Sequence, residues 1–336
     1  MKPISLSQSA RIFARGLTNY ISGKPLVISF ETTHSCTCNC RHCDRGGKIN
    51  EENRLTPEGF AKVMKMLRPA VIQLSGGESL LRDDLCDAVR AMKSHPYKLP
   101  HVILVSNASL LNRERYVKLK EAGVNRISIS LDFPDERHDD FRRHPGLFAH
   151  LEKTLPALAN EFNNKDIAVN TAITRANLPY LIDIVNKAQE WGIFISFSAY
   201  GVLRTGDEEF FISSEEDLKL LRQQLDEIIK LKKENGHILN SPYTLNKTYE
   251  FFKNGSIPDC KAGLRFLVVR PNGKFVPCSM MPQEKDYATQ EELKKEFTDK
   301  NTCGQCYVAI RSYSDKNFGS LMKDVTGFFF ANVLRK

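Results

Sequence analysis

Short apolar runs recur through the first two thirds of the chain, and segments with a helical spacing of apolar positions separate them. Runs of this length, rich in β-branched residues, predict buried strands. Six of them stand out: Leu26–Phe30, Val71–Leu74, Val102–Val105, Ile127–Leu131, Ile167–Ala172 and Ile193–Phe197. Their alternation with helices predicts an α/β fold of parallel strands joined by right-handed crossovers. The periodicity leaves open whether the sheet is doubly wound or rolled into a barrel.

Capping residues mark several helix ends. Thr56 is a predicted N-cap followed by Pro57 at the first helical position, and Gly123 and Gly192 each follow a helix as a stop signal. Helical spacing also covers about residues 82–94, 112–122, 147–162 and 178–191. The sequence therefore predicts a helix after each of the first five strands.

A different pattern begins near Gly206. Ser214–Glu234 predicts a charged amphipathic helix, and residues 236–255, with Gly236, Pro242 and Gly255, are interpreted as a linker. Two apolar runs then flank an Asn-Gly turn, which predicts a β-hairpin. Its strands and turn are Phe266–Arg270, Lys274–Pro277 and Pro271-Asn272-Gly273.

The composition narrows the class of protein. Hydrophobic residues make up 41% and charged residues 26% of the 336 positions, which excludes a disordered or collagen-like chain. No stretch reaches the roughly 18 apolar residues of a membrane span, and the N-terminus lacks a signal-peptide core, so we expect a cytoplasmic protein. The net charge of +8 comes from interleaved acidic and basic residues, and no nucleic-acid partner is expected.

Nine cysteines are the first chemical signal, and four of them lie within eight residues. Cys36, Cys40 and Cys43, at spacings of three and two intervening residues, can hold three irons of a 4Fe-4S cluster and leave the fourth iron open to a ligand. The alternative is a zinc site in which Cys38 completes the set, with His34 or His42 in reserve. Clustered thiols without export signals favour metal over disulfides.

Polar residues follow each predicted strand. Because the active site of a βα fold lies at the C-terminal ends of its strands, these residues predict one site. They are Ser75-Gly76-Gly77-Glu78, Ser106-Asn107, Ser130, Asp132, Asn170, Thr171, Ser198 and Tyr200.

Together, Cys36-x3-Cys40-x2-Cys43 and the later Gly76-Gly77-Glu78 resemble the motifs of the radical S-adenosylmethionine (SAM) superfamily, over about residues 25–205. The resemblance implies a partial (β/α)6 TIM-like barrel. It also implies that SAM chelates the open iron and is reductively cleaved, and that a 5′-deoxyadenosyl radical then removes a hydrogen atom from substrate. The reductant implied is a flavodoxin or ferredoxin.

The same resemblance assigns SAM contacts. The glycines and Glu78 match the segment that binds the SAM amino group, and Arg142 of His138-Asp139-x-x-Arg142 matches a carboxylate ligand, with Arg143 beside it. Ser79 stands where the family often has proline, and Ser-Asn-Ala replaces a Thr-Asn-Gly-like turn. The cofactor-binding residues expected are His42, Gly76, Gly77, Glu78, Asn107, Ser130, Asp132 and Arg142.

Four further cysteines, Cys260, Cys278, Cys303 and Cys306, surround and follow the predicted hairpin. A structural zinc ribbon is one interpretation. The other is an auxiliary 4Fe-4S cluster, because residues 258–308 resemble the twitch domain, a shortened relative of the SPASM domain. That resemblance implies a fully ligated cluster that accepts or relays an electron.

These observations divide the chain into an N-terminal amphipathic helix (1–24), the barrel (25–205), a helical connection (206–258), a small hairpin and helix domain for the auxiliary cluster (259–310) and a C-terminal helix (311–336). We expect an oxidation or bond-forming reaction on an unidentified small molecule, lipid precursor or peptide. A non-catalytic zinc protein or iron–sulfur electron carrier is the alternative.

Two further expectations concern the substrate and the surface. Ser198 and Tyr200 are candidates to face substrate, although a Tyr there also suits packing. About 25 residues before the first strand are too few for a leader-recognition domain, which weighs against a peptide. The apolar faces of Ile4–Ile21 and Phe328–Leu334 suit either packing on the barrel or a peripheral membrane contact.

Overall fold

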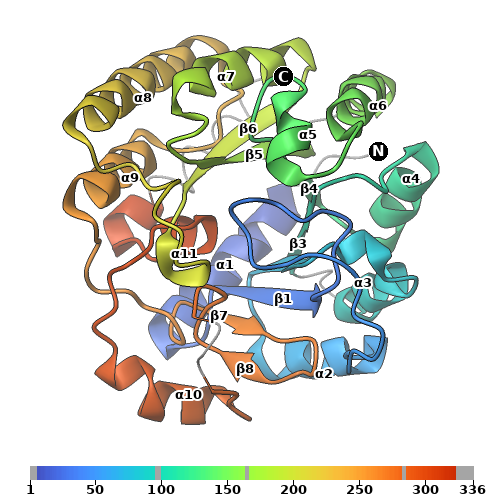
Figure 1. Ribbon diagram of the computed structural model, residues 1–336. Coiled ribbons are helices and arrows are strands. Elements are labelled where there is room, and N and C mark those ends of the chain that lie inside the picture. The colour runs from blue at the N-terminus through green and yellow to red at the C-terminus, as the bar shows by residue number, and fades with distance from the viewer. Residues whose placement is uncertain (1–5, 95–99, 163–165, 282–284, 323–336) are drawn as a thin grey trace.

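In the computed structural model, residues 6–94, 100–162, 166–281 and 285–322 are described. Six parallel strands alternate with helices, as the apolar runs predict (Figure 1). The strands are β1 (Val27–Thr33), β2 (Val71–Gly76), β3 (His101–Ser106), β4 (Arg126–Ser130), β5 (Ile167–Ile173) and β6 (Phe194–Ala199). The prediction of an α/β fold is confirmed.

The crossover helices end close to their predicted limits. Thr56 caps α2 by accepting from the Gly59 amide, and Gly123 ends α4 in the left-handed conformation. The helices between the six strands are α2 (Pro57–Leu67), α3 (Leu85–Lys93), α4 (Arg113–Ala122), α5 (Arg137–Arg142), α6 (Leu147–Phe162) and α7 (Leu181–Glu190). The predicted N-terminal amphipathic helix is α1 (Leu6–Ser22), and Phe328–Leu334 lies outside the described residues.

The interpretation of residues 236–255 as a linker is wrong. After α8 (Glu215–Asn235), which Gly236 ends, a second helix α9 (Pro242–Asn254) packs against it. Ser241 caps α9, Pro242 fills its first turn and Gly255 follows its last residue with positive φ. These residues are helix-end signals as much as turn signals, and their spacing of 13 residues spans a helix rather than a loop.

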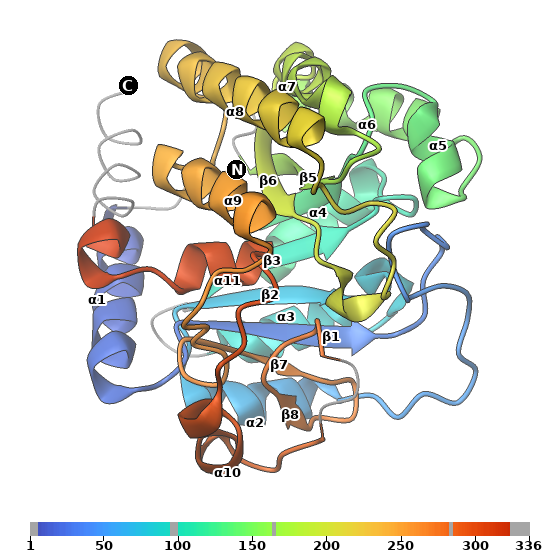
Figure 2. The ribbon, with the colours of Figure 1, turned by 60° about the vertical axis from the view of Figure 1, so that its left-hand side comes forward.

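The predicted hairpin forms, and it extends the main sheet. Strand β7 (Phe266–Val269) pairs in parallel with β1, and β8 (Phe275–Val276) pairs antiparallel with β7. The strand order is β6-β5-β4-β3-β2-β1-β7-β8, so β6 is not bonded to β1. Helix α11 (Ala309–Ser314) contacts β6 as well as β1 and β7, and thus lies across this opening (Figure 2).

The core lies between the sheet and its helices. Phe30 of β1 packs against Phe60 of α2 with ring centroids 4.9 Å apart. Alternate residues of β2, β3 and β4 are fully buried, and those between them are only half-buried. This alternation separates a dry outer face under the helices from an inner face that solvent reaches.

Candidate functional site

The loop after β1 carries the first four cysteines, and its backbone is anchored at several points. The Cys36 amide donates to the Gly47 carbonyl over 2.8 Å. The amides of Asn39 and Arg41 donate to the Arg142 and Phe141 carbonyls at the end of α5. The loop is therefore held against an element that follows β4, on the side where the parallel strands end.

Each of the three spaced thiols has a nitrogen donor within sulfur hydrogen-bond distance. The Asn107 amide lies 3.7 Å from Cys36 Sγ, and Arg142 Nη1 lies 3.7 Å from Cys40 Sγ. The Arg45 backbone amide lies 3.5 Å from Cys43 Sγ. Donors of this kind stabilise thiolate sulfur, the form that ligates iron.

Cys38 lies buried beside Cys36 and Cys40, and its backbone amide lies 3.5 Å from Cys36 Sγ. Its thiol lowers the pKa of Cys36 to about 7 and lowers that of Cys40, while its own pKa is raised. Burial raises the pKa of Cys43. Within the described residues no three His, Cys, Asp or Glu side chains converge as ligands of one metal ion. A cubane needs no such convergence, because each thiolate binds a different iron.

The two glycines after β2 permit close contact with the start of the cysteine loop. A Cβ on Gly76 would lie 2.3 Å from the Thr33 carbonyl oxygen, and one on Gly77 would lie 2.0 Å from that of Ser35. The Gly77 amide donates to Thr33 and the Glu78 amide to Ser35, over 2.7 and 2.8 Å. Sequence reasoning missed this role, since nothing in the motif shows which backbone the glycines approach.

Glu78 joins the ends of β2 and β3. Its carboxylate is fully buried and accepts from the Leu80 amide, the Ser106 hydroxyl and the Asn107 amide at 2.7–3.0 Å. Burial raises the pKa of Glu78, although these three donors act to lower it. Asn107 Nδ2 in turn donates to Thr37 in the cysteine loop, so Glu78 orients a residue that also contacts Cys36.

Asp132 and Arg142 form a buried ion pair beside Cys40. Arg142 Nε and Nη2 lie 2.8 and 2.7 Å from Asp132 Oδ2. Burial opposes ionisation of Asp132, but the Arg142 charge and hydrogen bond together with the other neighbouring groups hold the pKa of Asp132 low. Asp132 Oδ1 is buried without a partner among the described residues. Arg143 is exposed, which separates the two adjacent arginines.

His42 stacks on Phe141, with ring centroids 4.7 Å apart and planes 11° apart. Desolvation lowers the pKa of His42 to about 4, so the ring is neutral at pH 7. Ser130 ends β4 half-buried on the inner face.

Ser198 on β6 and Tyr200 just after it have different surroundings. Ser198 donates to Asn170 Oδ1 over 3.3 Å on the inner face. The Tyr200 ring packs with Phe133, Phe141 and Phe210, and its hydroxyl binds Thr205 and the Asp207 carbonyl. Tyr200 therefore holds the loop after β6, which is the packing role considered for it from the sequence.

Charged residues that the sequence reasoning did not select join the loop after β6 to the cysteine loop. Arg204 pairs with Asp44, and Arg41 pairs with Glu209 at 3.3 Å. Glu31, on the inner face of β1, lies 2.8 Å from His34 and 3.6 Å from Arg45. The alternation of β1 places Glu31 inward and is the signal that would have found it.

The four C-terminal cysteines come together away from the first set. Cys260, Cys278 and Cys306 are buried in one cluster with Met280 and Ile310, and Cys303 is half-buried beside them. Burial, followed by the neighbouring thiols, raises the pKa of Cys278. Burial therefore favours the protonated thiol, whose proton a bound metal would displace.

Arg311 of α11 connects the backbone segments that carry these thiols. Its fully buried guanidinium donates to the Ile257 and Cys306 carbonyls at 2.6 Å and to the Pro258 carbonyl at 3.0 Å. Asp315 accepts from Arg311 Nε and from the Lys261 amide, each at 3.2 Å. The pair thus holds the chain on both sides of Cys260.

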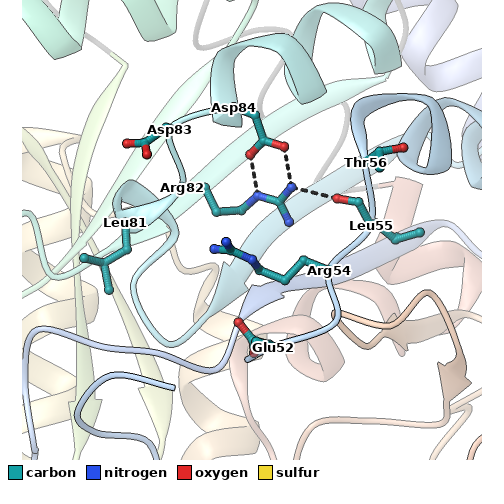
Figure 3. A pocket seen from close by; sticks show the side chains of 8 residues that line it. All are labelled: Glu52, Arg54, Leu55, Thr56, Leu81, Arg82, Asp83 and Asp84. Atoms are coloured by element: carbon teal, nitrogen blue, oxygen red, sulfur yellow. Dashed lines mark hydrogen bonds and ion pairs between the residues drawn. The ribbon is translucent and has the colours of Figure 1, made fainter. Parts of the chain in front are cut away.

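A separate groove lies behind the cysteine loop, between residues 52–56 and 81–84 (Figure 3). The Arg82 side chain crosses the groove, donates to the Asp84 carboxylate through two nitrogens and also donates to the Leu55 carbonyl. The Arg54 side chain points into the groove. Glu52, at its edge, accepts from the His34 amide. The groove contains none of the cysteines.

Among the described residues, no helix is both long and apolar enough to cross a membrane.

Comparisons with known proteins identify the family of the chain. A sequence model of the radical SAM superfamily matches residues 30–210, more than half of the chain. The AdoMet-dependent heme synthase of Methanosarcina barkeri is 28% identical over 78% of this chain and 79% of its own length. The probable GTP 3′,8-cyclase of Sulfurisphaera tokodaii is 27% identical over 79% and 84%.

A solved structure shares the fold. Streptococcus suis SuiB, bound to the precursor peptide SuiA, superposes with a TM-score of 0.63 at 15% identity, over 87% of this chain and 68% of that protein. At this identity the superposition speaks for the fold alone.

Proposed function

Since the chain belongs to the radical SAM superfamily and is therefore an enzyme that uses SAM and a 4Fe-4S cluster, we propose that Cys36, Cys40 and Cys43 ligate that cluster. When bound, the cluster supplies an electron that cleaves SAM to methionine and a 5′-deoxyadenosyl radical, which removes a hydrogen atom from substrate. A flavodoxin or ferredoxin is the proposed reductant. The substrate is unidentified, and the relatives named above act on chemically different molecules.

One observation carries this assignment: Gly76 and Gly77 lie in backbone contact with the start of the three-thiol loop. This contact brings Glu78 and Asn107 to the same end of the sheet as the thiols. Asn107 and Arg142 donate to the cluster thiolates, and Asp132 holds Arg142 in place. The neutral ring of His42 offers a flat face for the adenine of SAM.

We propose that Cys260, Cys278, Cys303 and Cys306 ligate an auxiliary 4Fe-4S cluster. Their burial in one group supports this assignment. Four protein thiolates leave no iron open to SAM, so the second cluster suits electron transfer from a substrate radical in an oxidation or bond-forming reaction. The half-buried polar inner face of the sheet disfavours a simple electron carrier, which has no use for a ligand site.

The test is anaerobic SAM cleavage by the reconstituted, reduced protein, with 5′-deoxyadenosine as the measured product. We expect the wild type to form it and Cys40→Ala not to. Cys86→Ala is the matched control, because Cys86 lies on α3 outside both thiol groups. Equal product from Cys40→Ala and wild type would refute the assignment of the first cluster.

A further inference from the structure

The inner face of the sheet is polar along several strands. Phe30 packs outward against α2, so its neighbours Ser29 and Glu31 point inward. The strand register places Ser29 beside Gln73 in one inner row, which continues through Ile103 to Arg126. A second inner row, nearer the C-terminal ends of the strands, consists of Ser130, Asn170 and Ser196.

Some of these inner side chains bind one another, and others have no partner. Ser29 pairs with Ser75, and Asn170 donates to Ser196, each over 2.8 Å. Across the parts of the chain that the structure describes, no hydrogen bond or ion pair involves the side chains of Gln73, Arg126, Ser128 and Ser130. These four are half-buried, so their polar groups face space that solvent reaches.

Arg126 adds an uncompensated charge to this surface. Asp166 is a carboxylate near it, but that carboxylate pairs with Lys120 over 2.7 Å. Desolvation lowers the pKa of Arg126, and the other ionisable groups near it are Tyr313 of α11 and His101 of β3, neither of which is an anion at pH 7. A desolvated cation without a counter-ion costs folding free energy, which a functional site can retain if a ligand supplies the anion.

We propose that Arg126 binds an anionic group of the substrate, a carboxylate or a phosphate, and that Gln73, Ser128 and Ser130 bind its uncharged polar groups. This inference rests on the proposed function, because it places the substrate inside the barrel below SAM. Ser130 lies four residues after Arg126 on β4, a rise of about 13 Å. The substrate is then an extended polar molecule that reaches along β4 from Ser130 to Arg126. A purely apolar lipid chain does not match this surface.

Thermal unfolding of the reconstituted protein with SAM tests the proposal without turnover. The probes are inorganic phosphate and glutarate, each compared with chloride at equal ionic strength. We expect at least one probe to raise the Tm of the wild type, and its apparent affinity to fall at least about tenfold in Arg126→Met. Without a probe, Arg126→Met should itself raise the Tm by about 2 °C, because it removes an unpaired charge.

Arg54→Met is the control, since Arg54 is exposed and lies in the separate groove. It should keep the response to the probe. The proposal is overturned if neither probe exceeds chloride with the wild type, if the response persists in Arg126→Met, or if Arg126→Met lowers the Tm as loss of a structural residue would. Failure of SAM cleavage would instead refute the proposed function, because the unfolding measurement does not depend on it.

Discussion

Arg311→Met tests whether one buried guanidinium positions the C-terminal thiols. The side chain is 1% exposed, and Arg311 makes three bonds to carbonyls and one to Asp315. Methionine fills similar volume but donates nothing. The variant therefore leaves the Ile257, Pro258 and Cys306 carbonyls without this donor and leaves the half-buried Asp315 without the Arg311 cation.

The expected loss follows from those contacts. Three hydrogen bonds at about 1 kcal/mol each, together with an unpaired carboxylate, give roughly 4–5 kcal/mol, within the range for breaking a buried pair. For a chain of this size the corresponding fall in Tm is about 10 °C. Because the freed segments flank Cys260 and Cys306, bound iron should fall from about eight to about four atoms per chain.

Iron and sulfide analysis with thermal unfolding measures both effects. Arg222→Met is the control, because Arg222 pairs with Asp226 at the surface of α8. Adding Asp315→Asn to Arg311→Met should restore part of the lost Tm, since it removes the unpaired charge. If Arg311→Met binds as much iron as the wild type and has the same Tm as the Arg222→Met control, the positioning argument is refuted.

Two other predictions follow from the site. Gly77→Ala should displace the cysteine loop, because its Cβ would meet the Ser35 carbonyl at 2.0 Å, and it should lower iron bound at the first cluster. Gly47→Ala is the control: it meets open space but carries a positive-φ strain that Gly77→Ala lacks, so it tests backbone strain without the steric clash. Equal iron in both variants would contradict the steric reasoning. Burial lowers the pKa of His138 to about 3, so below its unfolded value of about 6.5 the unfolded chain binds more protons. The stability that His138 contributes is thus present above pH 6.5 and is lost as pH falls towards 3, by about 1.4 kcal/mol per pH unit. The measurement is the urea concentration at the unfolding midpoint as a function of pH. His138→Asn, which keeps an acceptor for the Asp132 amide, should reduce the slope of this curve between pH 6.5 and 3. An unchanged slope would argue against a neutral buried ring.

Local patterns determined the elements and the chemistry offered by the first site. β-branched runs specify strands wherever they lie, and residues such as Thr56 and Gly123 act on adjacent backbone, so both could be predicted without knowledge of contacts. The helix α9 was missed because Pro242 and Gly255 have the same local preferences at helix ends as in loops. Only packing against α8 distinguishes the two.

The close spacing of Cys36, Cys40 and Cys43 is a local property, and the sequence alone determined that these thiols share one loop. Tertiary structure decided which residues from other strands meet that loop. The pairing of Arg142 with Asp132, the approach of Gly77 to Ser35 and the clamp of Arg311 on both sides of Cys260 join residues far apart along the chain. Such contacts depend on strand register and helix placement, which arise from the summed burial of the whole core and leave no mark at any single position.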